Sequence, residues 1–124
     1  MAFRLVEEVQ WHAPQELTPT QLSMLLAIAA EVRTRDADRG CRTVSMPYER
    51  LGRLSRVKPA TASRDLRRLA SGPLALDVRV PIGKDRHGEP LYAVPGRSPR
   101  FRVPLFEVPA DCGCSVCRSH RAAR

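Results

Sequence analysis

The sequence lacks the patterns that mark membrane spans, exported chains and common enzymes. It contains no run of about 18 apolar residues, so we expect no membrane-spanning helix. The N-terminus has no basic segment followed by an apolar one, so we expect no signal peptide and a cytoplasmic protein. There is no glycine-rich phosphate loop, no Ser-His-Asp pattern and no pair of carboxylates spaced along one helical face. The sequence therefore predicts a non-enzymatic protein without a membrane partner.

Lysine is scarce, and arginine supplies nearly all of the positive charge. At 124 residues one domain is expected, and the net charge is +8. That charge is unevenly distributed: residues 1–33 carry a net −2 and residues 34–124 a net +10. A GC-rich genome would account for part of the arginine content. A positive field of this kind favours encounter with polyanions and makes their binding salt-dependent.

Two short amphipathic helices joined by a tight turn are predicted between residues 48 and 69. In the first, over about 48–55, Leu51 and Leu54 lie three apart and would form a buried stripe. The second would begin at Pro59, which is favourable in a first helical turn. Its buried stripe would follow the i, i+4, i+7 spacing of Ala62, Leu66 and Leu69.

The opposite face of the second helix has small residues near its start and arginines farther along. A helix that enters a major groove needs small polar residues near its N-terminus to approach base edges, with cations beside them for phosphates. We expect Thr61 and Arg64 to face bases, and Arg67 and Arg68 to meet phosphates. The candidate DNA-binding residues in this region are Lys58, Ala60, Thr61, Ser63, Arg64, Arg67 and Arg68.

A family resemblance rests on the register of Leu51, Leu54, Thr61, Arg64, Leu66 and Leu69, with a hairpin behind it. This register resembles the winged helix-turn-helix domains of bacterial, plasmid and phage DNA-binding proteins. The resemblance covers residues 18–94 and implies an α+β fold with three helices and a β-hairpin wing. It also implies double-stranded DNA as the partner, in the bacterial cytoplasm or nucleoid.

Two positions depart from the pattern of that family. Arg56 occupies the turn position that is usually glycine, where a left-handed backbone is common and costs a side chain on the order of 1 kcal/mol. Lys58 replaces the usual Ser or Thr cap of the recognition helix, which costs about 1 kcal/mol again. Both departures add positive charge near an expected phosphate contact.

The flanking segments complete the expected domain, residues 18–95. Thr18 and Gln21 form a capping box that begins a supporting helix, which runs to about Arg33. Residues 42–46 suit a short strand. Alternating apolar residues over 76–82 predict a second strand, and residues 91–94 its return strand. The glycine-bounded turn 83–88 would be the tip of the wing and places Lys84 and Arg86 as further DNA contacts, with His87 read as a solvated turn residue.

The ends of the chain fall outside this domain. We interpret residues 1–17 as an N-terminal arm that includes an unassigned segment from Trp11 to Pro14. Residues 96–124 are read as an extension rich in proline and arginine. Within it, alternating Phe101, Val103 and Leu105 allow either an edge strand or a stiff extended tail.

A cysteine cluster occupies the C-terminal extension. Cys112, Cys114 and Cys117 are followed by His120, and such clustering in a cytosolic chain indicates metal before disulfide. Zn²⁺ accepts three thiolates and one imidazole tetrahedrally, with Cys41 as the alternative fourth ligand. An iron–sulfur cluster on all four cysteines is a second reading. A redox Cys-x-x-Cys pair and an inert tail complete the alternatives.

These observations predict a sequence-specific DNA-binding protein, foremost a transcriptional regulator of a bacterium, phage or plasmid. A replication or partition accessory protein is one alternative, and a small structural or protein-interaction module is another. A homodimer and a protein partner of the C-terminal tail are further expectations.

Overall fold

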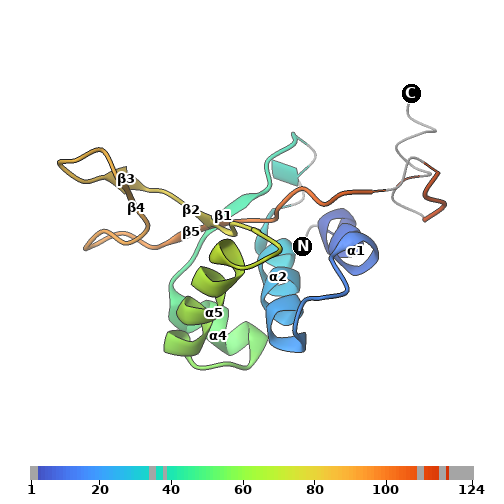
Figure 1. Ribbon diagram of the computed structural model, residues 1–124, viewed down its shortest axis with the longest axis horizontal. Coiled ribbons are helices and arrows are strands. Elements are labelled where there is room, and N and C mark those ends of the chain that lie inside the picture. Colours follow the sequence, from blue (N-terminus) through green and yellow to red (C-terminus); the bar gives the residue numbers. More distant parts are fainter. Residues whose placement is uncertain (1–2, 34–35, 38, 109–110, 115–116, 118–124) are drawn as a thin grey trace.

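The computed structural model describes residues 3–33, 36–37, 39–108, 111–114 and 117, which form a small α+β unit. The helices gather on one side of a short antiparallel sheet, and a β-arm projects away from both (Figure 1). In chain order the described elements are α1 (Phe3–His12), α2 (Pro19–Glu31), β1 (Thr43–Ser45), α4 (Tyr48–Ser55), α5 (Pro59–Ser71), β2 (Arg79–Val80), β3 (Gly83–Lys84), β4 (Pro90–Leu91) and β5 (Arg100–Arg102).

The supporting helix α2 begins where the capping box predicted. The Thr18 hydroxyl oxygen accepts a hydrogen bond from the Gln21 N–H at 3.1 Å, and the Gln21 side-chain oxygen accepts one from the Thr18 N–H at 3.1 Å. These bonds satisfy N–H groups that would otherwise lack partners at the helix start. The inward face of α2 buries Met24, Leu25, Ile28 and Ala29.

Helices α4 and α5 form where the sequence predicted them, with Arg56 at the turn and Lys58 at the cap position. Arg56 ends α4 in the left-handed region, with φ of 63° and ψ of 40°. Lys58 precedes α5 without a side-chain cap, and Pro59 occupies the first helical turn. Ala62, Leu66 and Leu69 are buried, as predicted for this helix.

The prediction that Leu54 belongs to the buried stripe of α4 is wrong, because this side chain is 44% exposed. Leu51, Gly52 and Ser55 form the buried face instead. At about 100° of rotation per residue, Leu54 lies roughly 100° from the centre of that face. The Ser23 hydroxyl of α2 donates to the Ser55 carbonyl at 3.4 Å and helps to join the two helices.

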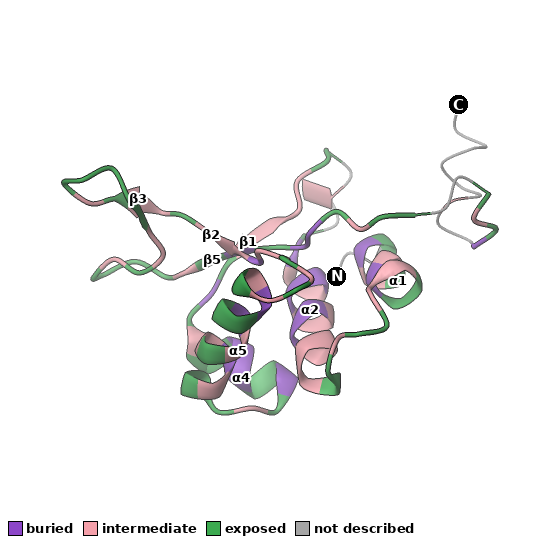
Figure 2. Ribbon diagram, viewed as in Figure 1, coloured by how far each residue is buried: buried purple, intermediate pink, exposed green. Residues whose placement is uncertain are grey.

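Residues 1–17, which we read as an arm outside the domain, contribute α1 to the same core. Leu5 and Val9 lie four residues apart on one helical face and are buried. Figure 2 shows buried residues on the inward sides of α1 and α2, which pack against each other. The apolar spacing within α1 therefore extends the core beyond the 18–95 boundary.

The sheet has the order β1-β5-β2, so β5 is its central strand rather than an edge or an extended tail. Phe101 pairs with Val44 on one side and with Arg79 on the other. Its ring is fully buried and meets the Tyr48 ring edge-on, with centroids 5.3 Å apart. Burial of this aromatic side chain favours pairing of β2 with β5. The return strand predicted over 91–94 is found in part: Leu91 pairs with Gly83 of β3 in the hairpin, and β4 ends at that residue.

The β-arm, residues 81–99, connects β2 to β5 and carries the hairpin β3–β4. Its turn is held by Asp85, whose carboxylate accepts the N–H groups of His87 at 2.8 Å and Glu89 at 3.0 Å. A second turn follows, where Val94 bridges to Arg97. At the base of the arm, the Arg79 guanidinium lies 4.1 Å from the centre of the Tyr92 ring. These contacts help to stabilise the β-arm, because its two-residue strands alone would not order it.

Candidate metal centre and nucleic-acid interface

Three thiols and one imidazole converge where the end of α1 meets residues 112–114 and 117. In Figure 1, α1 and the C-terminal segment lie at the end of the molecule opposite the β-arm. His12 Nε2 lies 3.0 Å from Cys114 Sγ, 3.6 Å from Cys117 Sγ and 3.8 Å from Cys112 Sγ. The four ligand atoms all lie within 4.8 Å of one another. Cys114 is buried and the other three residues are half-buried. This group could bind a metal ion.

Local structure positions each member of the group. His12 is the last residue of α1, so the packing of that helix fixes where its ring lies. The Cys117 N–H approaches Cys114 Sγ at 3.5 Å, so these two ligand residues lie close together. His12 Nδ1 is buried and has no hydrogen-bond partner in the described part of the chain. Within the described residues, the imidazole therefore contacts the thiols through Nε2 alone.

Proximity of the thiols also affects their protonation. Desolvation and hydrogen bonds with Cys114 and Cys112 raise the pKa of Cys117 from 9.0 to about 11. Several thiolates held this close would repel one another, so the protonated forms are favoured without a cation. A bound cation reverses that preference, because metal ligands are thiolates.

The fourth member of the group is His12, which was not among the predicted ligands. His120 lies outside the described residues. Cys41, the alternative, is not part of the group: its Sγ lies 3.4 Å from the Thr43 hydroxyl oxygen, and its hydrogen bonds to Thr43 lower the pKa of this thiol. His12 and Cys114 are 102 positions apart. No spacing rule connects residues at that separation, although His12 is one of only three histidines in the chain.

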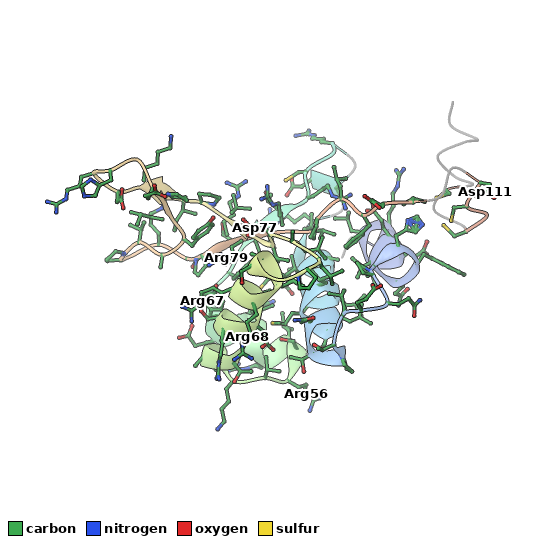
Figure 3. All side chains as sticks on the ribbon, in the orientation of Figure 1. Arg56, Arg67, Arg68, Asp77, Arg79 and Asp111 are labelled. Atoms are coloured by element: carbon green, nitrogen blue, oxygen red, sulfur yellow. The ribbon has the colours of Figure 1, made fainter. Side chains whose placement is uncertain are left out.

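The second candidate site is the outward face of α5. Ala60, Arg64, Arg67 and Arg68 are exposed on it, opposite the buried stripe, and Lys58 is exposed just before it. Figure 3 shows Arg67 and Arg68 along α5 and Arg56 at the turn. All of these arginine side chains are accessible to a large partner.

Two polar residues of the same helix are less accessible. Thr61 and Ser63 are half-buried. Ser63 makes a hydrogen bond with Tyr48 of α4, and burial raises the pKa of that phenol while the bond opposes the shift. Ser63 therefore helps to pack α5 on α4.

The β-arm adds exposed cationic side chains. Lys84 lies in β3, and Arg86 lies in the adjoining turn with its Nε 3.3 Å from His87 Nε2. Lys84, Arg86 and His87 are all exposed. Their positions on a projecting hairpin leave them free of the helical core.

No family model matches the chain, and comparisons with curated proteins and with solved structures gave no match. Within the described residues, none of the helices is long and apolar enough to cross a membrane.

Proposed function

We propose that the chain binds double-stranded DNA in a sequence-specific manner and acts as a transcriptional regulator of a bacterial or mobile-element system. In this proposal the domain is a winged helix-turn-helix, with α5 as recognition helix and the β-arm as wing. The observation that carries the proposal is the exposed row Arg64, Arg67 and Arg68 opposite the buried Ala62, Leu66 and Leu69. Such a face can enter a major groove without disturbing the core.

The chemistry of the face suits both parts of DNA recognition. Ala60 and Thr61 keep the start of α5 narrow, so the backbone can approach base edges closely. Arg64 can donate two parallel hydrogen bonds to a guanine, which is the commonest specific contact. Arg67, Arg68 and the cations of the β-arm would then meet phosphates, which supply affinity and its salt dependence.

The test is selection of bound fragments from a genomic library, followed by affinity measurements at several salt concentrations. The full chain is compared with an Arg64→Ala, Arg68→Ala double variant. Recovery of one short palindrome supports a regulator, whereas tandem direct repeats would favour a replication or partition accessory protein. Failure to retain any duplex at low salt would refute DNA binding and favour a protein-interaction module.

We further propose that the four-residue group binds Zn²⁺. Zinc–nitrogen and zinc–sulfur bonds of about 2.0 and 2.3 Å in a tetrahedron place nitrogen and sulfur about 3.5 Å apart. The three distances from His12 Nε2, between 3.0 and 3.8 Å, lie around that value. An iron–sulfur cluster usually takes four thiolates, and Cys41 would have to leave Thr43 to provide the fourth.

Metal analysis and an absorption spectrum of protein purified without oxygen test the metal proposal. We expect one equivalent of zinc and a colourless protein. A brown protein that bleaches on reduction would instead identify an iron–sulfur cluster. Less than about a tenth of an equivalent of any transition metal would refute a metal centre, because an occupied structural site binds zinc tightly.

A further inference from the structure

One face of α1 holds the chain after β5 at two points. We call this part of the chain the C-terminal segment; its described residues are 103–108, 111–114 and 117. Glu8 and His12 lie four residues apart, which places them one above the other on the same helical face. His12 contacts the thiols of residues 112–117 directly. Glu8 holds the C-terminal segment indirectly and nearer the sheet, because it pairs with an arginine that precedes β1 and binds that segment.

That arginine is Arg42, which connects three parts of the chain. Its Nη1 donates to the Glu8 carboxylate at 2.8 Å, its Nε to the Val103 carbonyl at 3.0 Å and its Nη2 to the Pro104 carbonyl at 2.9 Å. Arg42 and Glu8 side chains are each 21% exposed, so this ion pair is only partly screened by solvent. It fixes the chain directly after β5.

Residues 105–108 lead away from the sheet, and residues 112–114 lie near the end of α1. Phe106 packs against the core, whereas Leu105 is 79% exposed. The far end of the segment meets α1 through the His12 imidazole and the three thiols. After Pro104 and apart from Phe106, this segment buries little apolar surface, because residues 105, 107, 108 and 111 are exposed. A metal ion is therefore the strongest available means of ordering it.

We propose that the metal ion is a clasp that joins the C-terminal segment to α1, with His12 as the ligand that makes the centre part of the folded domain. This inference rests on the proposed metal binding and adds its structural role. The thiols alone form a local site that an unfolded chain could also offer. The fourth ligand exists in place only when α1 is packed through Leu5 and Val9. Metal binding and α1 packing are therefore thermodynamically linked, because a ligand that prefers the folded state stabilises it.

The experiment titrates the metal-free full chain with Zn²⁺ and follows both Trp11 fluorescence and thermal unfolding. Trp11 is the only tryptophan, precedes His12 and is 61% exposed, so it reports directly on this site. For the unmodified chain at about 100-fold excess of free zinc over Kd, we expect a rise in Tm on the order of 10 °C. His12→Gln should weaken zinc binding by more than about tenfold and remove most of the rise in Tm. Loss of a residue that only supports a metal ligand already costs about tenfold or more in affinity, so loss of a ligand should cost at least as much.

Three controls separate ligand loss from general damage. The metal-free His12→Gln chain should unfold at the temperature of the metal-free unmodified chain. His12→Cys supplies a thiolate at the same place and should restore zinc binding. His120→Ala and Cys41→Ser should each retain the zinc affinity and the rise in Tm.

The clasp is overturned if His12→Gln keeps the full zinc affinity and Tm rise, or if His120→Ala or Cys41→Ser abolishes them. Absence of zinc binding by the unmodified chain would refute the proposed metal function itself, and the clasp with it. The assay contains no DNA, so failure of the DNA-binding proposal leaves its outcome unchanged.

Discussion

His12 Nε2 lies 3.0 Å from Cys114 Sγ, although 102 positions separate the two residues. The contact brings the last residue of α1 against the cysteines of the C-terminal Cys-x-Cys-x-x-Cys sequence. The contact lies at the opposite end of the molecule from the β-arm, and α2 lies between α1 and α5 (Figure 1). The candidate metal centre and the proposed DNA interface are therefore separate surfaces. Each can be altered without touching the other.

Substitutions on α5 should separate base recognition from phosphate contact. Arg64→Ala should cost about 1–3 kcal/mol on the cognate site and relax preference at one base pair. Arg68→Ala should weaken all duplexes similarly and lower the salt slope by about one. Arg39→Ala, which removes an exposed arginine from the loop before β1, is the matched control and should leave specificity unchanged. Fluorescence anisotropy on cognate and scrambled duplexes measures these effects, and unchanged site preference in Arg64→Ala would contradict the orientation.

The β-arm should contribute affinity rather than specificity. Replacing both Lys84 and Arg86 by Ala removes two exposed cations from the hairpin without touching the core. Phosphate contacts carry little sequence information, so specific and non-specific affinities should fall by comparable factors. Equal affinities of the double variant and the unmodified chain at low salt would exclude the arm from the interface.

Gly52 should be required for the turn between α4 and α5. A Cβ at this position would lie 2.5 Å from the Val57 carbonyl oxygen, which belongs to rigid backbone. Alanine favours helix by about 1 kcal/mol, but the clash should outweigh that gain and leave Gly52→Ala less stable by about 1–3 kcal/mol. Urea unfolding measures the loss. Gly40→Ala, with open space around the Cβ but a φ of +82°, reports backbone strain alone. A Gly52→Ala chain as stable as the unmodified one would show that the turn can shift at no cost.

Zinc affinity should rise with pH. The pKa of Cys117 is raised to about 11 by desolvation and its thiol neighbours, so near neutral pH this thiol is protonated before metal binds. Each proton that zinc displaces makes apparent affinity increase by up to about tenfold per pH unit while that group is protonated. Competition with a chromophoric chelator at about pH 6, 7 and 8 measures the slope. A slope of zero would mean that no thiol proton is released on binding.

Local signals in the sequence predicted the elements that depend on near neighbours. The capping box of Thr18 and Gln21, the buried stripe of α5 and the left-handed Arg56 all depend on residues within one or two helical turns. The same signals gave the three thiols of the candidate metal centre, because those ligands are adjacent in sequence. For these features the interactions are short-range, and the pattern of side chains determines them.

Tertiary structure decided what long-range packing controls. Phe101 occupies the central strand because its ring is buried against Tyr48, and no local pattern distinguished that strand from an extended tail. Leu54 is exposed because the neighbours of α4 select which side of a short helix is covered. His12 meets the cysteines because Leu5 and Val9 dock α1 on α2, and packing energy rather than spacing brings the two ends of the chain together.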